Sequence, residues 1–189
     1  RDQCGAVRVV DGNGDSSTRL DIGAFEYQTG FVVTSTLDTV DANPGDGIAA
    51  DSAGRTTLRA AIMEANALAG DQTIVLLEGV YLLSLAGANE DSSASGDLDI
   101  TDHIVLKGAG SGVSVIDADH LDRAFEIVAG RIVRIEDVTI RRATNRSTSD
   151  GGAFLNRGNL TLVRTLVTDN RDTASHAGGG VYNTPSGVL

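Results

Sequence analysis

The stretch VRIEDVTI (residues 133–140) is matched 27 residues further along the chain by LTLVRTLV (160–167). In both stretches apolar side chains alternate with polar ones, which is typical of short strands with one buried face. Val133, Ile135, Val138 and Ile140 fall on one side if the register changes near Asp137. Glycine-rich segments such as KGAGSG and HAGGG separate these strands. The pattern predicts many short strands joined at tight corners.

A step of 27 residues joins further positions between residues 98 and 189. It gives three apolar series: Ile100, Ile127, Phe154 and Val181; Leu106, Val133 and Leu160; and Val113, Ile140 and Val167. Asn156 and Asn183 keep the same step. Strands this short, recurring at one period, predict a solenoid whose coils stack like residues on one another. In it the amides of Asn156 and Asn183 stack and hydrogen-bond. A repetitive antiparallel β-domain is the alternative.

Residues 56–70, TTLRAAIMEANALAG, follow helical spacing through Leu58, Ala61, Ile62, Ala65 and Leu68. Thr56 or Thr57 can cap the start of this helix and Gly70 can end it. Because a solenoid exposes strand edges at its ends, we expect the helix to cover the first coil. Residues 31–36 predict a strand before it, and residues 37–47 an acidic turn.

The overall charge limits the possible partners. The chain of 189 residues carries a formal net charge of −11. Nucleic acids and anionic membrane surfaces bind basic faces, so we expect neither as a partner. The chain has one cysteine, Cys4, so no internal disulfide can form. It holds no apolar run long enough to span a bilayer, so no membrane insertion is expected.

Several segments together resemble a known family. LDTVDANPGDG (37–47) and TTLRAAIMEANALAGDQTI (56–74) resemble the opening of the CSLREA-type domain of bacterial surface proteins. GDLDITDHIVLKGAG (96–110) and VIDADHLDRAFEI (115–127) resemble the coils that follow it. DGNGDSSTRLDIGAFEY (11–27) resembles the terminal segment before an anchor of the choice-of-anchor type. The resemblance implies a right-handed, pectate-lyase-like parallel β-helix on secreted or surface proteins.

The chain departs from the family pattern at three positions. Ile48 and Thr56 stand where the family has cysteines, and Ala60 stands where it has glutamate. The resemblance, together with the 27-residue repeat and the helical spacing, implies an all-β, right-handed parallel β-helix with coils of about 27 residues and a short N-terminal capping α-helix. Residues 1–30 are expected to close a preceding module or to form an assembly arm. Residues 31–72 would form the N-terminal cap, and residues 73–189 the coils, with an open C-terminal end.

Two acidic stretches are candidate Ca²⁺ sites. DGNGD places Asp11, Asn13 and Asp15 at alternate positions, with Asp21 as a further carboxylate. Calcium takes six to eight oxygen ligands, and alternating donors can wrap a chain around the ion. The second candidate set is Asp38, Asp41, Asn43 and Asp46. A plain turn and a solvated loop, respectively, are the alternatives.

The sequence gives less support for a catalytic site than for a Ca²⁺ site. Glu136, Asp137 and Arg164 could imitate a calcium-dependent lyase of acidic polysaccharides, but they fit the outer face of the strands equally well. His103, His120 and His176 show no ligand spacing. We therefore expect no enzyme. The predicted function is a structural or adhesive module of a bacterial surface protein, secreted or at the cell surface. Its partners would be further copies of itself, in a filament, or adjoining modules. A polysaccharide lyase or hydrolase, or a carbohydrate-binding module, is the alternative.

Overall fold

The computed structural model describes residues 9–10, 19–20, 30–87, 90–145, 151–173 and 178–189. The chain divides into two units, residues 1–30 and residues 31–189. In the first unit, β1 (Val9–Val10) pairs antiparallel with β2 (Arg19–Leu20). The second unit holds all the other elements.

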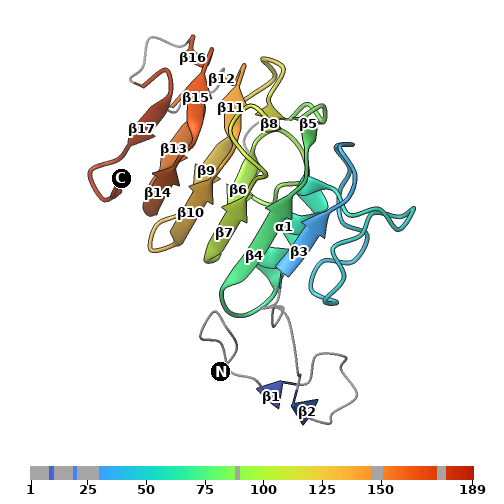
Figure 1. The fold of residues 1–189 in the computed structure, drawn as a ribbon. Coiled ribbons are helices and arrows are strands. Elements are labelled where there is room, and N and C mark those ends of the chain that lie inside the picture. Colours follow the sequence, from blue (N-terminus) through green and yellow to red (C-terminus); the bar gives the residue numbers. More distant parts are fainter. Residues whose placement is uncertain (1–8, 11–18, 21–29, 88–89, 146–150, 174–177) are drawn as a thin grey trace. The chain divides into compact units, whose positions relative to one another are not determined.

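The second unit is a parallel β-solenoid of about four turns (Figure 1). Three sheets run along it. The first sheet contains β3 (Gly30–Val33), β4 (Gln72–Leu76), β7 (Ile104–Lys107), β10 (Ile132–Glu136) and β14 (Asn159–Val163). The second contains β5 (Gly79–Leu82), β8 (Ser114–Asp117), β11 (Thr139–Arg141) and β15 (Leu166–Thr168). The third contains β6 (Leu98–Ile100), β9 (Phe125–Ile127), β13 (Phe154–Asn156) and β17 (Val181–Asn183).

Strands of successive coils pair in parallel, which confirms the predicted solenoid and excludes the antiparallel alternative. A short pair, β12 (Thr144–Asn145) and β16 (Arg171–Asp172), adds a parallel contact between the last two coils. Like residues stack inside the coils in rows set by the register. The rows are Ile74, Leu106, Ile135 and Leu162; Tyr81, Ile116, Ile140 and Val167; and Leu98, Phe125, Phe154 and Val181.

The predicted constant step of 27 residues is only partly right. The step holds between the third and fourth coils, where Ile140 pairs with Val167, and between β6 and β9. Between the second and third coils, however, Leu106 pairs with Ile135 and not with Val133. Phe154 likewise pairs with Phe125 and not with Ile127. A shift of two residues keeps every side chain on its face, so the apolar pattern alone cannot detect it.

The third series was wrong for a different reason. Ile116, not Val113, pairs with Ile140 and is fully buried. Val113 is 41% exposed, because it ends the glycine-rich corner before β8. An offset of three residues turns a strand position to the opposite face. The second coil therefore differs in length from the others at the glycine-rich corner before β8.

The register change near Asp137 is confirmed. Val133, Ile135, Val138 and Ile140 are all fully buried. Asp137 has a φ of 59°, which places it in the left-handed region and turns the chain between β10 and β11. Without that turn the two strands would point their apolar residues to opposite sides of the backbone.

The predicted helix is α1 (Leu58–Ala67). The Thr57 hydroxyl accepts the Ala60 N–H at 3.1 Å, so Thr57 is the N-cap. Leu58, Ala61, Ile62 and Ala65 are buried and join the core, as the helical spacing predicts. The helix packs on β4 and β6, two strands of the first coil (Figure 1). It ends at Ala67, and Gly70, with a φ of 94°, makes the turn into β4.

Candidate functional site

The C-terminal end of the solenoid presents strand edges. β14, β15 and β17 stand last in their sheets. One inward side chain of each strand is only partly buried, whereas its register partner one coil earlier is fully buried. The pairs are Leu162 and Ile135, Val167 and Ile140, and Val181 and Phe154. Such an edge offers N–H and C=O groups and apolar surface to another strand.

At one point of this edge the chain adds a further parallel pairing beyond β14. Val188 forms an isolated parallel bridge with Asn159. The Leu160 N–H donates to the Val188 carbonyl at 2.9 Å, and Leu160 is fully buried. Leu162, which follows in the same strand and faces the same core, is only partly buried. The core of the last coil therefore closes where a further strand lies over it.

Two equivalent glycines show how closely coils approach. Gly152 and Gly179 stand 27 residues apart at the corner that leads into the third sheet. A Cβ on Gly152 would overlap the Gly179 carbonyl oxygen and lie 2.7 Å from the Arg171 carbonyl carbon of the next coil. A Cβ on Gly179 would find nothing closer than 3.4 Å, which is ordinary contact. The space that Gly152 needs is thus filled by a neighbouring coil, while the same space at Gly179 is open.

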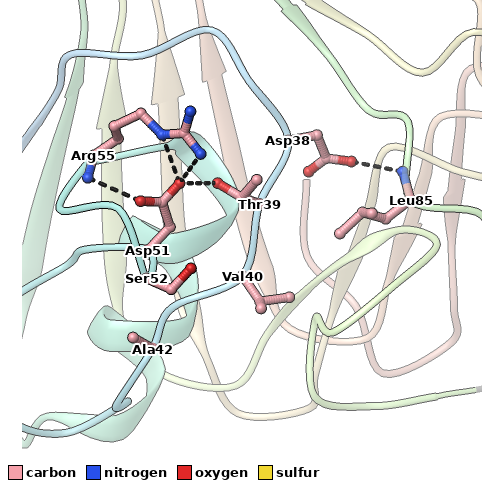
Figure 2. A pocket seen from close by; sticks show the side chains of 8 residues that line it. All are labelled: Asp38, Thr39, Val40, Ala42, Asp51, Ser52, Arg55 and Leu85. Atoms are coloured by element: carbon pink, nitrogen blue, oxygen red, sulfur yellow. Dashed lines mark hydrogen bonds and ion pairs between the residues drawn. The ribbon is translucent and has the colours of Figure 1, made fainter.

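A shallow pocket of about 250 Å³ lies in the cap beside the acidic loop (Figure 2). The Asp51 carboxylate accepts from Arg55 Nε and the Thr39 hydroxyl, both at 2.8 Å, and from two backbone N–H groups. The hydrogen bonds from Arg55 hold the pKa of Asp51 well below its usual range. Val40 and Leu85 supply apolar walls. Because the charged groups satisfy one another, the pocket offers no free ion to a ligand.

Beside that pocket a fully buried ion pair joins the cap to the first coil. Arg59 Nε donates to Asp38 Oδ1 at 2.6 Å, and both side chains are withdrawn from solvent. Arg59 also donates to the carbonyls of Ser93 and Gly96, each at 2.9 Å. Asp38 Oδ2 in turn accepts the N–H groups of Ser84 and Leu85. Buried charges need such complete pairing, so this contact is structural.

Three carboxylates meet on the third sheet. Asp91, Asp99 and Glu126 place one oxygen each within 4.8 Å of the others, and among the described residues this is the group of three acids whose oxygens already lie that close together. Glu126 is neutralised by ion pairs with Arg123 and Arg157. Burial, and then the charge of Asp97, raise the pKa of Asp99 to about 7. Asp99 can therefore exchange a proton near neutral pH.

Sequence reasoning missed this group, although a signal was present. Asp99 and Glu126 stand 27 residues apart, and they pair directly across β6 and β9. The apolar series at the 27-residue step do not include these acids, each of which lies between two inward-facing apolar residues. Asp91 comes from a separate loop and has no such signal.

The two predicted calcium sets have different outcomes. Asp11, Asn13, Asp15 and Asp21 lie outside the described residues. In the second set, Asp38 pairs with Arg59, so its carboxylate is already neutralised. Asp41, Asn43 and Asp46 lie together in the loop before α1, where Asp41 accepts the Asn43 N–H at 2.8 Å. Asp38 is therefore engaged by Arg59, whereas Asp41, Asn43 and Asp46 stay together in the loop.

The predicted lyase-like trio is an ion-pair cluster. Arg164 donates to both oxygens of Asp137, at 2.7 and 2.6 Å. This hydrogen bonding raises the pKa of Arg164, whereas a general base needs a lowered one. Arg141 and Arg142 both pair with the buried Asp117. The structure therefore brings Glu136, Asp137 and Arg164 together but leaves Arg164 protonated.

The remaining predicted residues have ordinary roles. His103 Nδ1 accepts the Ile132 N–H at 2.9 Å, and His120 Nδ1 lies 3.0 Å from the Thr144 hydroxyl. His176 and Cys4 lie outside the described residues. Asn156 donates to Asn183 Oδ1 at 2.6 Å, which confirms the predicted amide stack. Phe125 and Phe154 stack inside the coils with ring centroids 5.3 Å apart, so neither ring is available to a sugar.

Comparison with known proteins leaves the geometry as the basis for any functional argument. No family model, curated protein or solved structure matches the chain. None of the helices in the described residues is long and apolar enough to cross a membrane. A solenoid fold hosts many unrelated functions, so function has to be argued from its particular surfaces.

Proposed function

We propose that this protein is a structural module of a bacterial surface protein, located outside the cell, that stacks head-to-tail with a second copy. One observation carries the proposal. Three inward residues of the fourth coil, Leu162, Val167 and Val181, are only partly buried, whereas their counterparts in the third coil are fully buried. A further coil on β14, β15 and β17 would complete their burial and pair their open edges.

The second sheet has an open strand at each end, which suits a head-to-tail contact. β15 is the last strand of that sheet and β5 is the first. Translation along the solenoid axis would bring β5 of one copy beside β15 of the next. Head-to-tail contacts of this kind produce open filaments unless they close into rings.

The assignment to a bacterial surface rests on the resemblance to the CSLREA-type domain. The parts of that resemblance that lie in the cap have structural roles here. Thr57 caps α1, and Arg59, inside the segment that carries the resemblance, forms the buried ion pair with Asp38. The acidic surface fits a soluble module of such a protein.

Sedimentation velocity across a range of concentrations, with electron microscopy of the concentrated sample, tests the assembly. We expect concentration-dependent association of the natural chain and its loss in Leu162→Lys. A buried charge at the contact would oppose stacking, whereas in the free chain Leu162 is only partly buried. The matched control is Leu166→Lys, because Leu166 is 50% exposed on the outer side of β15. A chain that stays monomeric at high concentration would contradict the proposal.

Gly179→Ala is a second and more conservative test. The open space at Gly179 accepts a Cβ in the single chain, but a stacked coil would occupy it as Gly179 itself does at Gly152. We expect Gly179→Ala to fold normally and to associate at least tenfold more weakly. Gly180→Ala is the control, since its Cβ would contact only Val167 of the same coil, at 3.6 Å. Equal association of both variants would argue against stacking at this corner.

Asp99 favours a second candidate, an enzyme that cleaves acidic polysaccharides. It has a pKa of about 7 and lies close to Asp91 and Glu126. Paired carboxylates with different pKa values can act as acid and base in glycoside cleavage. Release of reducing ends or unsaturated products from polyuronates, abolished in Asp99→Asn, would support it. Absence of product from the natural chain would dismiss it.

A further inference from the structure

We infer that the loop formed by residues 41–50 and helix α1 bind one calcium ion through Asp41, Asp46 and Glu64. The set differs from the one expected from sequence, because Glu64 of the helix takes the place of Asp38 and the Asn43 side chain is not a ligand. The inference is independent of the stacking proposed above.

The first observation is an unpartnered oxygen. Asp41 is only 5% exposed, and its Oδ2 is buried without a hydrogen-bond partner. Its Oδ1 accepts the Asn43 N–H at 2.8 Å, so the side chain is held in place. A buried carboxylate oxygen with no donor is costly and is rare in folded proteins. A cation that supplies the missing partner removes this cost.

The second observation is the charge around Asp41. Burial is the main reason that the pKa of Asp41 is raised, and the negative charges of Glu64 and Asp46 raise it further. The same three carboxylates form no ion pair with any described residue. Residues 31–70 contain two basic side chains, and both are engaged elsewhere: Arg55 pairs with Asp51 and Arg59 with Asp38.

Glu64 is held where a ligand would be needed. It lies on α1, is fully buried, and accepts the N–H groups of Gly45 and Gly47. Each of its oxygens has one such donor and retains a lone pair. Asp46 is exposed, and its Oδ1 accepts the Ile48 N–H at 2.8 Å. The oxygens of these three groups are not as close together as those of Asp91, Asp99 and Glu126, so binding of the ion would draw them closer.

The ligand chemistry selects calcium. Carboxylate oxygens are hard donors, and a loop able to add backbone carbonyls and water suits the six to eight ligands and flexible geometry of Ca²⁺. Mg²⁺ requires near-ideal octahedral geometry and gives up its water reluctantly, so we expect it to bind more weakly. The bound ion would join the acidic loop to the capping helix and stiffen the end of the solenoid.

Thermal unfolding of the full chain, followed by circular dichroism in chelator and in 10 mM CaCl₂, tests the inference. At a calcium concentration about a hundred times the dissociation constant, we expect the unfolding temperature to rise by about 5–10 °C. Asp41→Asn keeps the bond from the Asn43 N–H but removes the charge. It should unfold at the same or a higher temperature than the natural chain in chelator, and at a lower one in calcium.

Three further variants locate the ion and control for misfolding. Asp46→Asn changes an exposed residue, so it should fold and lose most of the calcium effect. Asp91→Asn, in the other acidic group, and Asp15→Asn, in the N-terminal candidate loop, should keep the effect. Calorimetric titration with CaCl₂ then counts the ions lost by each variant. No rise in unfolding temperature with calcium, or an equal rise in Asp41→Asn and Asp46→Asn, would overturn the inference.

Discussion

Arg59 Nε donates to Asp38 Oδ1 at 2.6 Å, across 21 positions of the sequence and with both side chains removed from solvent. Asp38 precedes the capping helix and Arg59 lies in its first turn. Through the carbonyls that Arg59 binds and the N–H groups that Asp38 accepts, the pair also reaches residues 84–96 of the first coil. The pair therefore links the loop before the helix, the helix itself and the first coil at the N-terminal end of the solenoid.

Replacement of one partner should destabilise the whole domain. In Arg59→Met the carboxylate of Asp38 stays buried without its counter-charge, and we expect a loss of about 3–5 kcal/mol in the free energy of unfolding. Urea titration followed by circular dichroism measures it. Arg55→Met is the matched control, because Arg55 is half-exposed and Asp51 keeps other donors; about 1 kcal/mol or less is expected. Similar losses of unfolding free energy in both variants would show that burial does not make the Arg59–Asp38 pair more important for stability than the exposed pair.

The corner glycines should differ sharply in their tolerance of a methyl group. Gly152→Ala places a Cβ against the backbone of the next coil, so we expect a loss of about 3 kcal/mol or more in unfolding free energy. Gly179→Ala should change it by about 1 kcal/mol or less, because the same space is open there. Thermal unfolding of dilute, monomeric samples compares them. Equal stability of the two variants would contradict the described packing of the third and fourth coils.

The stacked amides give a third prediction. Asn156 is fully buried and donates to Asn183 Oδ1 and the Val188 carbonyl, while its own oxygen accepts the Gly158 N–H at 3.1 Å. Asn156→Ala leaves these partners unpaired and should cost about 1–3 kcal/mol. Asn183→Ala, at an exposed position, should cost clearly less. Hydrogen exchange should show faster exchange of the Gly158 amide in the first variant alone.

The pKa of Asp99 predicts a particular pH dependence. Because burial raises it to about 7, the folded chain binds more protons than the unfolded chain between its ordinary value of 3.8 and 7. Stability from this group is therefore present at low pH and is lost as pH rises through this window. The loss is a few kcal/mol at most, at about 1.4 kcal/mol per pH unit.

Asp99→Asn removes the titrating group and preserves an acceptor for the Ser93 N–H. We expect the natural chain to lose stability relative to this variant as pH rises from 4 to 7, and the difference to be constant above pH 8. Urea unfolding at several pH values, with chelator present, provides the comparison. Asp137 is the control with the opposite sign, since its hydrogen bonds from Arg164 lower its pKa and its contribution is lost at acidic pH. Parallel pH curves for the natural chain and Asp99→Asn would refute the assignment.

Much of the fold could be predicted from local patterns. VRIEDVTI places four residues in the core because strand alternation and one corner at Asp137 fully determine which side each faces. Thr57 and the apolar spacing that follows it were enough to locate α1. The 27-residue step correctly paired Ile140 with Val167 and Asn156 with Asn183, where the coils have equal length.

The pairing of the second and third coils depended on the tertiary structure. Leu106 faces Ile135, two positions from the expected Val133, because a shift of two residues leaves each side chain on its face and is invisible in an apolar pattern. Candidate sites were even less accessible from sequence. The charge of Glu64 acts on Asp41, 23 positions away in the sequence. Asp91 and Glu126 are 35 positions apart in the sequence, yet their carboxylate oxygens lie within 4.8 Å of each other. Side-chain alternation decides what each residue faces along its own strand, whereas only the folded corners and loops decide which distant charges share one site.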